Sequence, residues 1–206
     1  MTTAICFDCD GTLLRFERSY GEILTEAFET ELGHVSDDLL SAYDEAFFAA
    51  FEALEPDPVR RGMAAALDAG DLDGDPEALA EALLAVEQAA TAVPDGTHES
   101  LRALGESNRL AVITNGVGDW QRAKLEYHDL LSHFETVVTS YEAGAHKPDA
   151  APFESLRSRL DAEQYVMVGD DYEADVEGAR AAGFVPVHVE DSEEKPEFWA
   201  TLRAMV

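Results

Sequence analysis

Two aspartates near the start of the chain stand two residues apart, in the run Phe7-Asp8-Cys9-Asp10-Gly11-Thr12. This run closes a short apolar stretch over residues 4–7, which is typical of a buried strand. Side chains two residues apart point to the same side of an extended chain, so the two carboxylates would lie close together and repel. A divalent cation between them, or a division into nucleophile and general acid, would relieve this repulsion. The alternative is a strand that runs into an acidic turn, because Asp and Gly are common turn residues.

Three later apolar runs are also followed by residues that could do chemistry. Each has an ordinary explanation when taken alone: a strand-to-helix turn, a surface lysine, or the acidic first turn of a helix. Ligands of open parallel sheets, however, bind beyond the carboxyl ends of the strands. The sequence therefore predicts one site built from several strand ends. Thr114-Asn115-Gly116 follows run 110–113, His146-Lys147-Pro148 lies beyond run 136–139, and Gly169-Asp170-Asp171 follows run 165–168, with Asp175 four residues further on.

The second half of the chain alternates between short apolar runs and helical patterns. The runs are rich in β-branched residues, which favours strands, and helices between consecutive strands imply a parallel sheet covered on both faces. We therefore predict an α/β fold with a doubly wound, Rossmann-like parallel sheet, in which residues 5–7 form one more strand. The predicted strands are 110–113, 136–139, 165–168 and 185–189, and the predicted helices are 97–106, 119–129, 152–160 and 172–182.

Residues 17 to about 92 carry helical patterns only. Apolar residues recur with the spacing of one helical face, and Ser36 before two aspartates is typical of a helix start. Pro56, Pro58 and Pro76 separate the later helices. Four helices joined by short polar loops predict a small bundle. We expect a catalytic core formed by residues 1–15 and 92–206, with an all-α cap over residues 16–91 inserted into it.

The chain of 206 residues has a formal net charge of −29 and a pI near 4.2, although 46% of its residues are hydrophobic. That apolar content excludes disorder as the reason for the charge. Nucleic-acid binding is disfavoured, because it depends on clustered Lys and Arg. Only three lysines occur: Lys124, Lys147 and Lys195. This composition resembles proteins of salt-accumulating archaea, and an acidic protein from an ordinary environment is the alternative.

No secretion signal and no apolar run of membrane-spanning length is present in the sequence, so we expect a cytoplasmic protein without membrane contact. Cys6 and Cys9 form a C-x-x-C pattern, but residues three apart on a strand point to opposite faces. We interpret both as small apolar core residues. The oligomeric state is not predicted.

The polar residues resemble the four motifs of the haloacid dehalogenase superfamily of hydrolases. The resemblance covers almost the whole chain, and the helical stretch resembles the inserted cap of the superfamily's first subclass. The motifs are Phe7-Asp8-Cys9-Asp10-Gly11-Thr12-Leu13, Val112-Ile113-Thr114-Asn115-Gly116, the stretch 134–149 with Lys147-Pro148, and Val168-Gly169-Asp170-Asp171 with Asp175 and Gly178-Ala179.

The resemblance assigns roles to the residues of the predicted site. Asp8 would attack phosphorus and form an aspartyl-phosphate, which divides one difficult displacement into two. Asp10 would protonate the leaving alkoxide and then deprotonate the hydrolytic water. Thr114, Asn115 and Lys147 would bind the phosphoryl group, and Lys147 would also keep Asp8 ionised.

The resemblance also implies Mg²⁺. Asp8, the main-chain carbonyl of Asp10, and Asp170 would be its ligands. Asp175 would orient Lys147 or a metal-bound water. Asp171 departs from the family pattern, which often has Ser or Thr there. It could be a further ligand or the acidic first turn of the next helix, and we favour the turn.

Several activities within and outside the superfamily compete. Dehalogenases lack the second aspartate, so Asp10 favours phosphoryl transfer, and the absence of lysine from residues 1–93 disfavours the phosphonate-cleaving branch. A sugar-phosphate mutase keeps both aspartates and stays open. A phospho-acceptor signalling module uses the same residue types in another order, and the glycine-rich motifs of dinucleotide and P-loop sites are missing. We expect removal of phosphate from a small phosphorylated metabolite.

The composition predicts that salt stabilises the protein. At roughly 1 M KCl the Debye length is about 3 Å, so repulsion between surface carboxylates is largely screened. The temperature of unfolding should therefore rise along a KCl series. A sucrose series, which acts by exclusion from the protein surface, is the control. Full stability in dilute buffer would support the alternative of an acidic protein from an ordinary environment.

Overall fold

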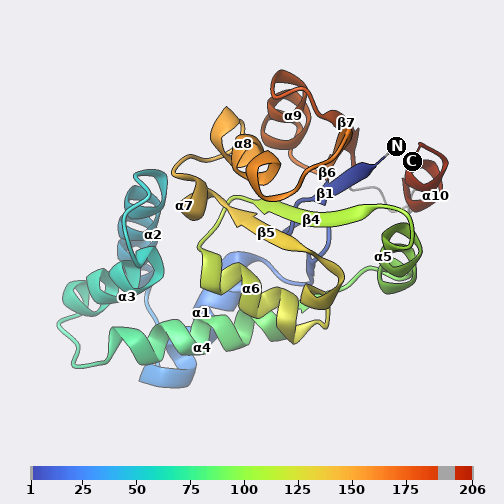
Figure 1. Ribbon diagram of the computed structural model, residues 1–206. Helices are drawn as coiled ribbons and strands as arrows, with labels where there is room; N and C mark the ends of the chain where they lie inside the picture. Colours follow the sequence, from blue (N-terminus) through green and yellow to red (C-terminus); the bar gives the residue numbers. More distant parts are fainter. Residues whose placement is uncertain (1, 190–197, 206) are drawn as a thin grey trace. The chain divides into compact units, whose positions relative to one another are not determined.

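The computed structural model describes residues 2–189 and 198–205 of the chain. Its main feature is a five-stranded, all-parallel sheet with the order β5-β4-β1-β6-β7 (Figure 1). The first strand lies in the middle, so the chain winds outward from it in both directions. The predicted α/β fold with a doubly wound parallel sheet is confirmed. The strands are β1 (Thr3–Phe7), β4 (Arg109–Thr114), β5 (Thr136–Thr139), β6 (Gln164–Gly169) and β7 (Val185–His188).

Alternation of side chains along the strands builds two cores, one on each face of the sheet. In β1, Ile5 and Phe7 belong to one core, while Ala4 and Cys6 belong to the other. Every residue of β1 is buried, as expected for a central strand of a parallel sheet. Cys9 lies in the core opposite to that of Cys6, and both thiols are buried and free of disulfides.

Helices cover both faces of the sheet and complete three layers. Leu101 and Leu104 of α5 (Thr97–Gly105) and Leu125 of α6 (Gly118–Tyr127) pack in the core of Ile5 and Phe7. The opposite core contains Phe153 and Leu156 of α8 (Ala150–Arg159) and Ala179 of α9 (Gly178–Ala181). The C-terminal helix α10 (Phe198–Met205) contributes Leu202 to the first core.

The predicted helix over residues 172–182 is wrong in detail. It consists of a π-helical turn, η2 (Tyr172–Glu177), and the short α9. Apolar spacing over so short a segment does not distinguish these forms, and single π-helical turns are frequent at functional sites. The sequence prediction also omitted η1 (Leu131–His133) and α7 (Ser140–Ala143), which are too short to show a helical period.

The chain forms two compact units, Met1–Arg15 with Val93–Val206, and Phe16–Ala92. The second unit contains α1 (Tyr20–Leu32), α2 (Asp37–Glu52), α3 (Pro58–Ala69) and α4 (Pro76–Ala89). A two-stranded ribbon pairs β2 (Arg15–Phe16) with β3 (Thr91–Ala92), close to the points where the chain enters and leaves this unit.

Local sequence explains where the helices of this second unit begin. Ser19 and Glu22 form a reciprocal capping box at the start of α1. Ser36 accepts a hydrogen bond from the backbone N–H of Leu39, and the Asp75 carboxylate accepts one from that of Glu77. Apolar faces then pack α2 against α3 and α1 against α4.

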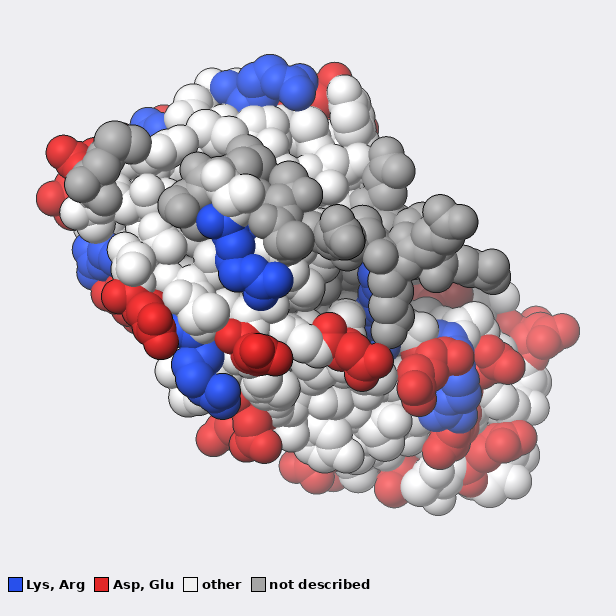
Figure 2. Space-filling model, turned by 90° about the vertical axis from the view of Figure 1, so that its right-hand side faces the viewer, with Lys and Arg blue, Asp and Glu red and all other residues white. Residues whose placement is uncertain are grey.

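The surface is acidic. Asp and Glu side chains spread over the face shown in Figure 2 without gathering into a single patch. Spread charge of this kind suits a solvated surface better than a docking site for one cationic partner. Among the described residues, no helix combines the length and the apolar character that a bilayer crossing requires.

Candidate active site

A pocket of about 180 Å³ lies at the carboxyl ends of the central strands. Asp8 follows β1, Thr114 ends β4 and Asp170 follows β6, so the pocket occupies the position where open parallel sheets bind ligands. All the residues proposed as site residues from the sequence line it together. The lining consists of Asp8, Asp10, Thr114, Asn115, Lys147, Asp170, Asp171, Ala174 and Asp175.

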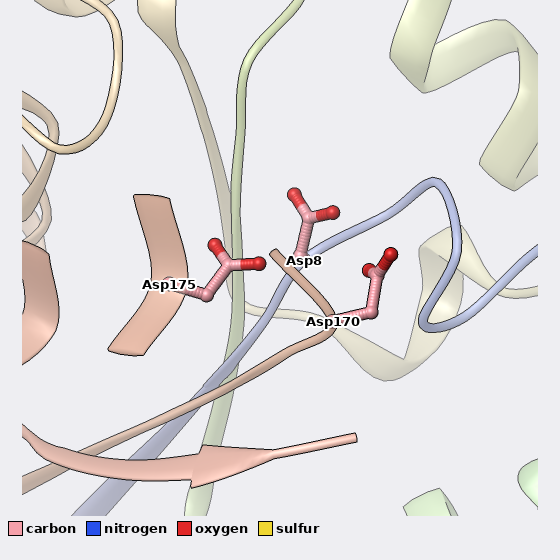
Figure 3. Close-up of side chains that lie close together, drawn as sticks. All are labelled: Asp8, Asp170 and Asp175. Carbon is pink, nitrogen blue, oxygen red and sulfur yellow. The ribbon is translucent and has the colours of Figure 1, made fainter. Parts of the chain in front are cut away.

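Three of these carboxylates converge. Asp8, Asp170 and Asp175 each offer an oxygen that lies within 4.8 Å of the oxygens offered by the other two. Figure 3 shows Asp8 between Asp170 and Asp175, with the Asp175 carboxylate extending toward it. Burial raises the pKa of the Asp170 carboxyl, a hydrogen bond from Thr12 opposes this rise, and the charge of Asp8 adds to it. Burial, with a further contribution from Asp8, also raises the pKa of Asp175.

One buried ammonium group balances part of this charge. Lys147 Nζ donates hydrogen bonds to Asp8 Oδ1 at 2.8 Å, to Asp175 Oδ1, and to the backbone carbonyl of Ile113 at 2.9 Å. Burial opposes protonation of Lys147, but the charges of Asp8 and Asp175 outweigh it and raise its pKa. Lys147 therefore joins two of the three carboxylates.

Asn115 holds Lys147 in this position. Its Nδ2 donates to the carbonyl of Lys147 at 3.0 Å, and its Oδ1 accepts from the Lys147 backbone N–H at 2.8 Å. The peptide bond that follows, Lys147–Pro148, is cis. The sequence assigned the Asn115 side chain to substrate, but both ends of its amide are bonded to the Lys147 backbone.

Asp10 has separate partners. Lys124 Nζ donates to both of its carboxylate oxygens, at 2.6 Å and 2.8 Å, and Gln121 Nε2 donates to Oδ2 at 2.9 Å. The sequence predicts that Asp8 and Asp10 point to the same side of an extended strand, and both do line this pocket, but β1 already ends at Phe7. Strand alternation therefore does not fix the direction of either side chain.

Three residues around the site were missed from the sequence: Thr12, Gln121 and Lys124. Thr12 Oγ1 donates to Asp170 Oδ1 at 2.8 Å. The scarcity of lysine was the signal for Lys124, which stands in the helix that follows Thr114-Asn115-Gly116. Lys124 is only 1% exposed, although a lysine on a helix usually lies in solvent.

The donor set fits a hard divalent cation. Clustered carboxylate oxygens are the ligands that Mg²⁺ and Ca²⁺ prefer, and Asp8, Asp170 and Asp175 form such a cluster. The loop after Asp10 leaves space for the Asp170 carboxylate. Gly11 has a φ of +84°, and a Cβ there would lie 2.2 Å from Asp170 Oδ2.

Asp171 behaves as the turn interpretation predicts. Its carboxylate accepts a hydrogen bond from the Ala174 backbone N–H at 2.9 Å and thereby caps η2. The same turn presents Asp175, whose other oxygen accepts from the Asp171 backbone N–H at 3.2 Å. The cap thus fixes the start of the element that carries Asp175.

We predict that Lys147→Met destabilises the protein by about 3–5 kcal/mol, because it leaves Asp8 and Asp175 without their shared cation. Urea unfolding in high KCl with EDTA measures this loss. The double variant Lys147→Met/Asp175→Asn should recover part of it, since one uncompensated charge is removed. Arg122→Met is the matched control: its partner Glu142 is partly exposed, so its loss should stay below about 1 kcal/mol. A stable Lys147→Met variant would contradict the prediction.

Comparison with known proteins identifies the family. The model of haloacid dehalogenase-like hydrolases matches residues 2–183. The ribulose-1,5-bisphosphate 5-phosphatase of Halopiger xanaduensis is 34% identical over 94% of this chain and 87% of its own length. The phosphoserine phosphatase of Thermus thermophilus is 42% identical over 43% of this chain and 39% of its own length.

Solved structures agree on the fold. The putative hydrolase YfnB of Bacillus subtilis, bound to magnesium, has a TM-score of 0.72 and 21% identity over 98% of both chains. A 2-haloacid dehalogenase of Pseudomonas syringae also has a TM-score of 0.72, with 24% identity over 100% of both. This chain therefore belongs to the haloacid dehalogenase-like hydrolases, as its four motifs predict.

Proposed function

We propose that the protein removes phosphate from a small phosphorylated metabolite through an aspartyl-phosphate on Asp8, with Mg²⁺ as cofactor. One observation carries the proposal: Asp8 and Asp10 line the same pocket, yet each is bonded to a different lysine. The two carboxylates are thus held apart and can take different roles. A dehalogenase needs the first carboxylate but not the second.

Asp8 is the proposed nucleophile. Its Oδ1 accepts a hydrogen bond from Lys147, which leaves Oδ2 to attack phosphorus. The new bond joins Asp8 to phosphorus as the bond between phosphorus and the ester oxygen breaks. For this step Asp10 carries a proton on Oδ1 in place of the hydrogen bond from Lys124 there, while Oδ2 stays bonded to Lys124 and Gln121. Asp10 gives this proton to the departing alkoxide. In the second step Asp10 takes a proton from water, the water oxygen bonds to phosphorus, and the bond to Asp8 breaks.

The other residues bind and orient. We assign Thr114 and Lys147 to the phosphoryl oxygens and Asn115 to the positioning of Lys147, in place of the substrate contact expected from the sequence. Asp175 holds Lys147 from the opposite side. Asp8, Asp170 and the main-chain carbonyl of Asp10 would hold Mg²⁺, which when bound supplies positive charge against the repulsion between a carboxylate nucleophile and a phosphate.

The substrate class follows from the pocket and the relatives. A volume of about 180 Å³ admits a phosphoryl group and a few further atoms, but no large polymer. The relatives over most or part of the chain are named for sugar bisphosphate, phosphoserine and nucleotide substrates. We therefore propose a small phosphate monoester, with no role for nucleic-acid polymers or membranes. The extreme acidity and the Halopiger relative support a salt-rich cytoplasm as the working environment.

We predict that Asp8→Asn lowers phosphate release from p-nitrophenyl phosphate by at least about 10³-fold, in Mg²⁺ and high KCl, because the amide cannot form the covalent intermediate. A panel of phosphorylated metabolites run beside it identifies the substrate. If the wild-type protein releases no phosphate from the ester or the panel, the proposal is wrong. Conversion of a hexose 1-phosphate into an isomer, without free phosphate, would indicate a mutase.

We predict that Mg²⁺ raises the unfolding temperature of the wild-type protein and that EDTA reverses the rise. A ligand at 100 times its Kd stabilises the folded state by about 2.7 kcal/mol. Asp170→Asn should lose the rise, since a proposed ligand is removed. Asp171→Asn is the matched control and should keep it, because Asp171 caps η2. A Mg²⁺ response that survives in Asp170→Asn would exclude Asp170 as a ligand.

A further inference from the structure

We infer that Lys124 and Gln121 form a clamp that positions Asp10 for proton transfer to the leaving group. The inference rests on the proposed function, because it assigns these two residues a part in the same reaction. It adds residues that none of the four sequence motifs contains. We call them the Asp10 clamp.

The ammonium of Lys124 is the first half of the Asp10 clamp. Its Nζ lies 2.6 Å and 2.8 Å from the two carboxylate oxygens of Asp10, and the residue is 1% exposed. Burying an ammonium group costs desolvation free energy, and a closely placed carboxylate offsets that cost. Contact with both oxygens also fixes the plane of the carboxylate, which a single hydrogen bond would leave free to rotate.

Gln121 is the second half. Its Nε2 donates to Asp10 Oδ2 at 2.9 Å, and the residue is 4% exposed. The amide nitrogen thus faces Asp10, while the amide oxygen, Oε1, is buried without a hydrogen-bond partner among the described residues. Gln121 and Lys124 are three residues apart on α6 and therefore share one face of that helix.

The second motif provides the space for this clamp. A Cβ at Gly116 would lie 2.5 Å from Gln121 Nε2 and 2.8 Å from its Cγ. A glycine after Asn115 therefore lets the Gln121 side chain pass close to the backbone on its way to Asp10. α6 begins at Gly118, so the short connection between β4 and α6 also sets the direction in which the Asp10 clamp extends.

Asp10 needs such support because of where it lies. β1 ends at Phe7, so no strand pairing reaches Asp10 beyond its isolated bridge to Leu14. A general acid must stand within hydrogen-bonding distance of the leaving oxygen, and small displacements of catalytic groups lower rates strongly. The Asp10 clamp fixes the side chain where the backbone alone does not.

The test compares two esters that differ in their need for a proton. An alkyl phosphate releases an alkoxide that must be protonated, whereas p-nitrophenolate leaves without help. Lys124→Met should lower kcat/KM for the alkyl ester by about 10²-fold or more and for p-nitrophenyl phosphate by less than about 10-fold. KM should change little for both esters. Arg122→Met, on the same helix and paired with Glu142, should match the wild-type protein.

A double-mutant cycle separates positioning from folding. In an Asp10→Asn background, Lys124→Met should add no further loss toward the alkyl ester, because the group it positions is already gone. Gln121→Leu keeps the ammonium and should give a smaller loss with the same dependence on the leaving group. Gln121→Leu replaces Lys124→Met in this test if the Lys124→Met protein folds poorly.

Three outcomes would overturn the inference. Equal losses for both esters would show a general structural defect, and additive losses in the Asp10→Asn background would show that Lys124 acts elsewhere. Activity of Lys124→Met equal to that of Arg122→Met would overturn the clamp and leave the proposed function standing. A wild-type protein that hydrolyses neither ester nor the metabolite panel would instead overturn the proposed function, and the role of the clamp with it.

Discussion

The density of negative charge at the ends of the central strands is the constraint on which the site depends. Asp8, Asp170 and Asp175 converge within 4.8 Å, and Asp10 lines the same pocket. A phosphate substrate would add further negative charge. Two buried lysines offset part of this negative charge, one bonded to Asp8 and one to Asp10. A bound cation would offset the negative charge that remains. Both lysines that the structure describes are thus used here, while arginines form the ion pairs of the surface.

The fold makes this concentration possible because parallel strands end at one edge of the sheet. β1 and β6 pair up to Phe7 and Val168, and the Asp8 backbone N–H donates to the Val168 carbonyl at 2.8 Å, so Asp8 and Asp170 follow neighbouring strands directly. The elements that follow these strands also place side chains at the same edge of the sheet. α6 carries Lys124 and Gln121, and η2 carries Asp175. The short π-helical turn and its Asp171 cap place Asp175 beside Lys147, whose backbone Asn115 holds.

Much of this architecture could be predicted from the sequence. Buried parallel strands are short, apolar and β-branched, so β1, β4, β5, β6 and β7 stood out, and polar residues directly behind them were recognised as a site. The Asp10 clamp could not be predicted in the same way. A lysine and a glutamine on a helix read as solvated residues, and their partner is more than 100 residues away in the chain. The departure of Asp10 from the strand and the division of residues 172–182 into η2 and α9 also depend on local hydrogen bonds that apolar spacing does not report.

The likeness in fold to a dehalogenase and to a magnesium-bound hydrolase has a consequence for the origin of specificity in this chain. A shared fold of this kind does not choose the leaving group. Halide departs as an anion that needs no proton, whereas an alkoxide does need one. The choice therefore rests on whether a proton donor is present beside the nucleophile and is held there. In this chain the proposed donor is Asp10, and its carboxylate is bonded to Lys124 of α6, an element separate from the strand that precedes Asp8. Under the proposed function, reaction type thus depends on a contact between two segments of the core and not on the sheet alone.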